Sequence, residues 1–279
     1  MRDNTIQAGS VETHYWEVTP EHPEATVVLV HDGAFGSDAY TSWHEIMARL
    51  GGRYRVLAPD LLGFGDTDKV VYTDRSPYAF RTAHLAAFCA ALDINGAHFV
   101  GHSFGGSLVL RALAASTLPV LSATSISGSG GPWRVKEAVA ELGRFDGTEQ
   151  DLRRLTALMV DDYPGLDEVL KLRYANTLKP GHVEAVLAGK LKHPTRTPQP
   201  APDSWPEALK SVSVPVLVIA GDRDPLMAAG WTEHLAGLSP AITVHRLDAK
   251  HAPNMDQPDT VAALLLSHLA RTREPSARS

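Results

Sequence analysis

Apolar residues in this chain gather in short runs, and segments with helical periodicity lie between the runs. Such runs are typical of strands buried in a parallel sheet, and an alternating pattern over residues 5–18 predicts a hairpin at the sheet edge. Strands that alternate with helices predict an α/β fold, with a mostly parallel sheet flanked by helices. The predicted strands are residues 26–31, 54–60, 98–102, 121–127, 214–220 and 242–247.

The alternation stops between residues 133 and 191, where only helical patterns occur, and it resumes after a proline-rich stretch over residues 193–202. A stretch rich in proline suits a stiff connector. We therefore predict that residues 1–132 and 206–279 form the sheet domain. Residues 133–205 form an all-helical cap, or lid, inserted between two strands, with the proline-rich stretch as its exit linker.

Composition narrows the class of protein. The 279 residues are 44% hydrophobic, which is enough to bury one sizeable core. A net charge of −6 without long runs of like charge argues against nucleic-acid and membrane partners. Cys89 is the single cysteine, so a reducing compartment is expected. With no signal-like or membrane-spanning apolar stretch, we expect a cytoplasmic protein that acts on a small molecule, and a homo-oligomer is left open.

A candidate nucleophile lies where the predicted strand over residues 98–102 meets a helix. Gly101, Ser103 and Gly105 form the pattern G-x-S-x-G. A serine on such a sharp strand-to-helix turn presents its Oγ away from the sheet, and side chains at the two glycine positions would collide. The helix N-terminus behind the serine offers unpaired N–H groups to a developing oxyanion.

A serine nucleophile needs a base, and the base needs an acid that orients it. Parallel sheets carry their sites at the carboxyl ends of strands. Two further strand ends qualify, because one is followed by Asp224 and the other by His251. The order Ser103, Asp224, His251 is that of the α/β-hydrolase triad.

Other residues compete for these roles. Asp222 is the alternative acid, and we prefer Asp224 because it lies farther past the strand end. Asp248 is too close in sequence to His251 to turn back without a tight loop. His102, beside the serine, is the alternative base, although its side chain should point away from that of its neighbour.

The second N–H of an oxyanion hole should come from the loop after the first buried strand, in addition to the N–H of Phe104. Gly33 is the candidate for this second donor, with Ala34 as its alternative. No cluster with metal-ligand spacing and no dinucleotide motif occurs, so we expect no metal and no cofactor.

These motifs together resemble the α/β-hydrolase superfamily along nearly the whole chain. The resemblance implies the fold and the triad chemistry, but it says little of the substrate. The matching stretches are residues 31–33 (HDG, where the family has HGG or HGx), 59–65 (PDLLGFG, for PDxxGxG), 101–105 (GHSFG), 221–224 (GDRD) and 250–251 (KH).

The lid carries a narrower resemblance. Residues 172–181 are similar to the lid helix of the meta-cleavage-product hydrolases, which split a C–C bond in vinylogous 1,5-diketones. The resemblance implies that Arg173 grips a substrate carboxylate; alternatively, Arg173 lays its stem along the lid with its head in water. The chain departs from this subfamily at His102, Asp32 and Ala252, where asparagine, glycine and tryptophan are usual.

The sequence therefore predicts a serine hydrolase that cleaves an ester or a C–C bond next to a carbonyl in a small, mostly apolar substrate. Trp133, Leu155, Met159 and Tyr174 are expected to line its pocket with Arg173, or else to form the core of the lid. The alternatives are a lyase that uses the triad for acid–base chemistry and a non-catalytic ligand receptor on the same fold.

Overall fold

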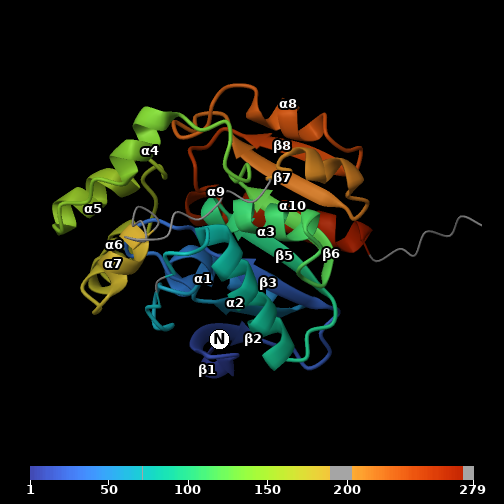
Figure 1. Cartoon of the computed structure of the whole chain (residues 1–279), viewed down its shortest axis with the longest axis horizontal. Coiled ribbons are helices and arrows are strands. Elements are labelled where there is room, and N and C mark those ends of the chain that lie inside the picture. Colours follow the sequence, from blue (N-terminus) through green and yellow to red (C-terminus); the bar gives the residue numbers. More distant parts are fainter. Residues whose placement is uncertain (71, 189–202, 273–279) are drawn as a thin grey trace, which may run out of the picture.

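A computed structural model describes residues 1–70, 72–188 and 203–272, and within these residues eight strands form one sheet. The first two strands form the predicted antiparallel hairpin at the edge, and β3 to β8 run parallel to one another. The sheet order is β1-β2-β4-β3-β5-β6-β7-β8 (Figure 1). The strands are β1 (Arg2–Ala8), β2 (Val11–Val18), β3 (Thr26–Val30), β4 (Arg55–Pro59), β5 (Ala97–His102), β6 (Val120–Ile126), β7 (Val216–Gly221) and β8 (Ile242–Leu247).

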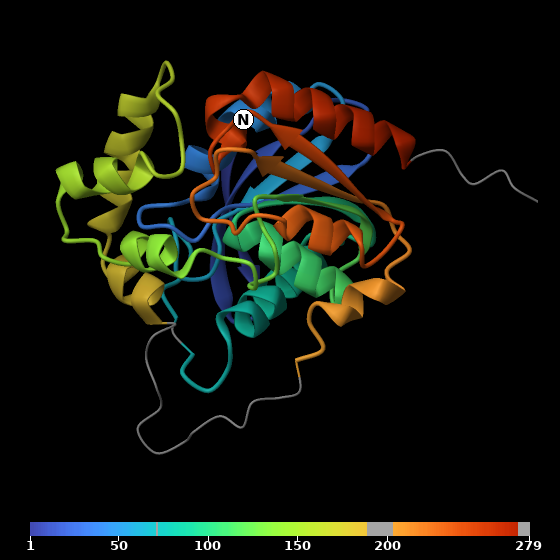
Figure 2. The same ribbon diagram turned by 90° about the horizontal axis from the view of Figure 1, so that it is seen from above.

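Helices cover both faces of this sheet, as Figure 2 shows from above. Two of them, α1 (Ala39–Leu50) and α10 (Pro258–Arg271), share one apolar cluster with the sheet. On the other face lie α2 (Pro77–Ala91), α3 (Phe104–Ala114) and α8 (Trp231–Ala236). The predicted α/β architecture with two helical layers is confirmed. Two short elements complete this part of the chain, the 3₁₀ helix η2 (Glu207–Ser211) and α9 (Pro253–Asp256).

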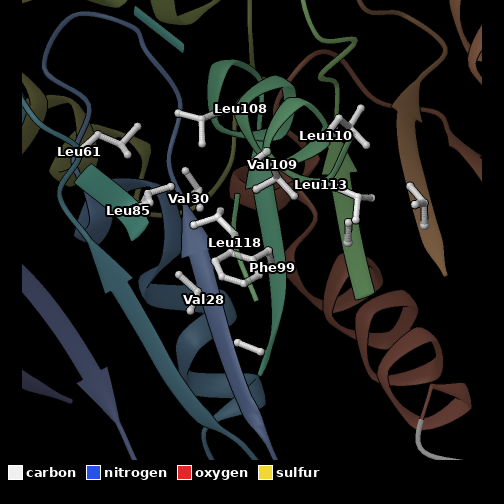
Figure 3. Packing of buried hydrophobic residues seen from close by; sticks show 14 of the residues in the cluster. Val28, Val30, Leu61, Leu85, Phe99, Leu108, Val109, Leu110, Leu113 and Leu118 are labelled. Carbon is white, nitrogen blue, oxygen red and sulfur yellow. The ribbon is translucent and has the colours of Figure 1, made fainter. Parts of the chain in front are cut away.

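Strand β3 explains why the sheet needs both layers. Successive side chains of a strand point to opposite faces. Val28 and Val30 pack against the layer of α2 and α3, whereas Val27 and Leu29 pack against that of α1 and α10. Figure 3 shows Val28 and Val30 beside Phe99 of β5 and the side chains of α3. All five side chains are fully buried, so the sheet is held on both sides.

Four further helices follow β6 and pack beside the end of the sheet where the parallel strands terminate (Figures 1 and 2). They are α4 (Lys136–Leu142), α5 (Glu149–Thr156), α6 (Leu166–Thr177) and α7 (His182–Leu187). The boundaries drawn at residues 132 and 206 stay a prediction, and the proline-rich linker over residues 193–202 lies outside the described residues. Across the described part of the chain, no helix combines the length and apolar character needed to cross a bilayer.

Candidate active site

Ser103 occupies the sharp turn between β5 and α3, with φ 55° and ψ −112°. A side chain at Gly101 would overlap the carbonyl group of Gly105, and one at Gly105 would overlap the carbonyl oxygen of Val30. The two glycines therefore let the helix pass close to the strands. The first N–H groups of α3 have no acceptor within the helix, and they lie beside the serine.

Ser103, His251 and Asp224 form one chain of hydrogen bonds. The Ser103 Oγ lies 2.8 Å from His251 Nε2, and His251 Nδ1 lies 2.7 Å from Asp224 Oδ2. The His251 and Asp224 side chains are 3% and 2% exposed, so water competes little for these bonds. The other Asp224 oxygen accepts the backbone N–H of Leu226 at 2.9 Å, which holds the carboxylate in place.

The competing residues have other partners. Asp222 pairs with Arg246 at 2.6 Å and Asp248 pairs with Arg223 at 2.5 Å, both at the surface. The His102 Nε2 donates to the backbone carbonyl of His251 at 3.1 Å, while its Nδ1 lies 3.6 Å from Asp32 Oδ2. Burial lowers the pKa of His102, which favours the neutral ring. Neither ring nitrogen of His102 is therefore directed at the serine.

The loop after β3 brings Gly33 against Phe104. A Cβ added to Gly33 would lie 3.1 Å from the Phe104 Cβ. The Ala34 N–H donates to Asp32 Oδ1 at 2.9 Å, whereas the described residues offer no acceptor to the Gly33 N–H. Of the two donors that the sequence left open, Gly33 is therefore the one whose N–H is available.

A cavity of about 220 Å³ opens beside Ser103 and is lined mainly by apolar groups, among them Met159, Leu142 and Val186. Gly33 and Phe104 also line it. A larger hollow of about 630 Å³ lies between α2, α3 and residues 203–208, but Ser103 is not among the residues that line it. Of these two cavities, the smaller is therefore the one that Ser103 lines.

Of the apolar residues expected to line the pocket, Met159 does so, and three others pack elsewhere. Leu155 is buried in a cluster with Phe35, and Tyr174 packs at the edge of the same cluster. The Trp133 ring stacks on His234 with 5.3 Å between the ring centroids. Leu155 and Tyr174 therefore agree with the alternative that the sequence left open, in which such residues form the core of the lid. Trp133 agrees with neither expectation, because it packs against α8 and the apolar cluster on that face of the sheet.

Arg173 lies on the buried face of α6, so its head is not in water, yet it is not among the residues that line the cavity. Its Nη2 lies 2.8 Å from Asp32 Oδ2, and both side chains are almost completely buried. Burial alone would raise the pKa of the Asp32 carboxyl, but the Arg173 guanidinium holds that pKa well below its usual range. The anionic partner therefore comes from the loop after β3 and not from a substrate.

Two further residues that sequence reasoning missed tie the same loop to the helices after β6. The Gly36 N–H donates to His182 Nε2 at 2.8 Å, and Asn176 Nδ2 donates to the Gly36 carbonyl at 3.1 Å. Gly36 has φ 72°, and a side chain there would overlap the Arg173 carbonyl. No local pattern marks these contacts, because each joins residues about 140 positions apart.

Residues 27–264 match the alpha/beta hydrolase family. Together with the sheet topology and the serine turn, this match shows that the chain belongs to the α/β-hydrolase family. The relatives of this chain named below are hydrolases.

Within that family the chain is similar to meta-cleavage-product hydrolases. It is 29% identical over 181 residues to the 2-hydroxy-6-oxo-2,4-heptadienoate hydrolase of Pseudomonas putida, a match that spans 64% of each protein. It is also 29% identical over 239 residues, 80% of this chain and 74% of the relative, to the 2-hydroxy-6-oxo-6-(2'-aminophenyl)hexa-2,4-dienoic acid hydrolase of Metapseudomonas resinovorans. The meta-cleavage product hydrolase of Pseudomonas fluorescens superposes with a TM-score of 0.83 at 25% identity, covering 97% of this chain and 98% of that one. An enol-lactonase and a carboxylesterase also resemble the chain.

Proposed function

We propose that this chain is a serine hydrolase that cleaves an ester or a C–C bond next to a carbonyl in a small, mostly apolar substrate. The observation that carries the proposal is the continuous hydrogen-bonded chain from Asp224 through His251 to Ser103, at the wall of an apolar cavity. A hydroxyl bonded to a buried imidazole, itself bonded to a buried carboxylate, is the arrangement that activates a serine.

In the proposed reaction, Ser103 Oγ attacks the substrate carbonyl carbon while His251 Nε2 takes the hydroxyl proton. Asp224 keeps His251 oriented and stabilises the imidazolium. The N–H groups of Gly33 and Phe104 hold the oxyanion. The bond to the leaving group then breaks, and His251 returns the proton to that group. A water molecule then attacks the acyl carbon while His251 takes its proton, and His251 passes that proton to Ser103 Oγ as the acyl group leaves.

The leaving group separates the two bond types. An ester expels an oxygen that accepts the proton directly. A C–C bond breaks only if the departing electron pair can delocalise into a neighbouring carbonyl, as an enolate. The similarity to meta-cleavage-product hydrolases favours the C–C reaction, and the similarity to the enol-lactonase and the carboxylesterase favours the ester.

The first test is covalent labelling. Incubation with a fluorophosphonate, followed by mass spectrometry of the intact protein and its peptides, should place one adduct on Ser103 and none on the Ser103→Ala variant. An unlabelled Ser103 in folded protein would overturn the proposal in favour of a ligand receptor. A hydrolysis screen of p-nitrophenyl esters, lactones and ring-fission dienoates then identifies the bond. Labelling without hydrolysis in any of the three series would favour a lyase.

A further inference from the structure

Asp32 lies between the substrate cavity and the buried guanidinium of Arg173. It lines the cavity beside Ser103, and its Oδ2 pairs with Arg173 Nη2 at 2.8 Å. Arg173 itself does not line the cavity. Among the described residues that line the cavity, Asp32 is therefore the one hydrogen-bonded to this cation.

The Asp32 carboxylate accepts a hydrogen bond from Arg173 Nη2, as the carboxylate of a bound ligand would. Its two oxygens also accept from the Ala34 N–H at 2.9 Å and the Ser42 Oγ at 3.2 Å, so several donors converge on it. The Arg173 Nε and Nη1 are buried and have no hydrogen-bond partner among the described residues. Because Arg173 does not line the cavity, we expect these two nitrogens to become available to a substrate oxygen only when Asp32 is altered.

We propose that Asp32 is a specificity-determining residue, which acts as a built-in carboxylate and thereby prevents Arg173 from selecting acidic substrates. This inference rests on the proposed hydrolase function. The enzyme would accept, at this end of the cavity, substrates that are uncharged there, such as neutral esters, lactones or ketones. A charged substrate group would have to displace a buried carboxylate, which is both bonded and of like charge.

Among the described residues that line the cavity, the other charged one is Arg134, which is half-buried. Its backbone is held against the stretch after Asp224 by a bridge to Met227. It contributes the same positive charge whether or not Asp32 is present. A change in acid preference on altering Asp32 is therefore independent of that charge, and Arg134→Gln in each background measures the contribution of Arg134 separately.

The test compares kcat/KM for one substrate as a free acid and as its methyl ester, the acid group standing away from the cleaved bond. Asp32→Asn should raise the acid-to-ester ratio by roughly 10- to 100-fold, the range expected for a hydrogen-bonded contact with a charged group. Absolute rates fall for both substrates if the loop shifts, but this loss cancels in the ratio. In Asp32→Asn/Arg173→Met the ratio should return to that of the wild type.

A second measurement covers variants that fold poorly because Arg173 is left unpaired. Sodium formate supplies a free carboxylate in place of the one that Asp32→Gly removes, so it should raise the melting temperature of this variant more than sodium chloride at equal ionic strength does. The wild type and Asp32→Gly/Arg173→Met should show no such difference between the two salts. An unchanged acid-to-ester ratio in folded Asp32→Asn would overturn the inference. So would a single variant that formate cannot rescue while the double variant folds. If the wild type hydrolyses neither substrate although Ser103 is labelled, the proposed function fails instead.

Discussion

Replacing Arg173 by methionine tests how much the buried ion pair contributes to the free energy of unfolding. Methionine retains most of the apolar volume of the side chain but removes the charge that faces Asp32. Asp32 is 1% exposed, so its carboxylate would be left in the interior without a cation. Breaking a buried pair by removing one partner costs about 3–5 kcal/mol.

The lower end of that range is expected here, because the Ala34 N–H and the Ser42 hydroxyl still bond the Asp32 carboxylate in the variant. A loss of about 3 kcal/mol corresponds to a fall of about 6–12 °C in the melting temperature of a protein of this size. Arg153→Met is the matched control. Arg153 pairs with Asp167 at 2.7 Å with both side chains more than half exposed, and such a pair contributes less than about 1 kcal/mol.

The pH dependence identifies Asp32 as the source of the loss. In the wild type the pKa of Asp32 is held below its usual value near 3.8, so the pair stabilises the fold above that value and loses this contribution as pH falls further. In Arg173→Met the cation that opposes burial most strongly is gone, while His102 and His31 remain, so we expect the pKa of Asp32 to be higher than in the wild type. Protonation then relieves the unpaired charge. The difference between variant and wild type, measured by thermal or urea unfolding, should narrow from pH 7 towards pH 4. Equal losses in Arg173→Met and Arg153→Met, or a difference that does not change with pH, would refute this reasoning.

Three further outcomes are expected. Ser103→Ala should lower kcat by at least about 10⁴-fold without unfolding the protein, and a variant that keeps a tenth of the activity would remove the serine from the mechanism. Asp224→Asn should lower kcat about 10⁴-fold, whereas Asp222→Asn, which removes one partner of an exposed ion pair, should change kcat less than about threefold. A larger loss in Asp222→Asn would make Asp222 the acid that orients His251. Burial lowers the pKa of His182 to about 4, so the neutral ring accepts the Gly36 N–H. The fold should therefore lose stability as pH falls from 6.5 towards 4, and unfolding of His182→Gln should depend less on pH over the same range.

Local patterns in the sequence were sufficient to predict the sheet, its edge hairpin and the serine turn. Strands of a parallel sheet are buried on both faces and need continuous apolar runs, and such runs can be recognised locally, without knowledge of the rest of the fold. The serine turn needs glycine on both sides because a Cβ at either position would overlap a backbone carbonyl. The G-x-S-x-G spacing is therefore sufficient to identify the turn from the sequence. The chain order of serine, acid and histidine follows from where the strands end, so Ser103, Asp224 and His251 could be proposed without coordinates.

The tertiary structure decided the pairings between distant segments. Asp224 and Asp222 lie two positions apart after the same strand, yet Asp224 bonds His251 whereas Asp222 pairs with Arg246 at the surface. Asp32 and Arg173 are 141 residues apart, so neither local spacing nor the face of one helix could reveal that they meet. A buried charge must be compensated, but the physics of burial does not say by which residue. The sequence left open whether Arg173 points inward or into water, and only the packing of α6 on the loop after β3 determined that it is buried and that its partner belongs to the protein.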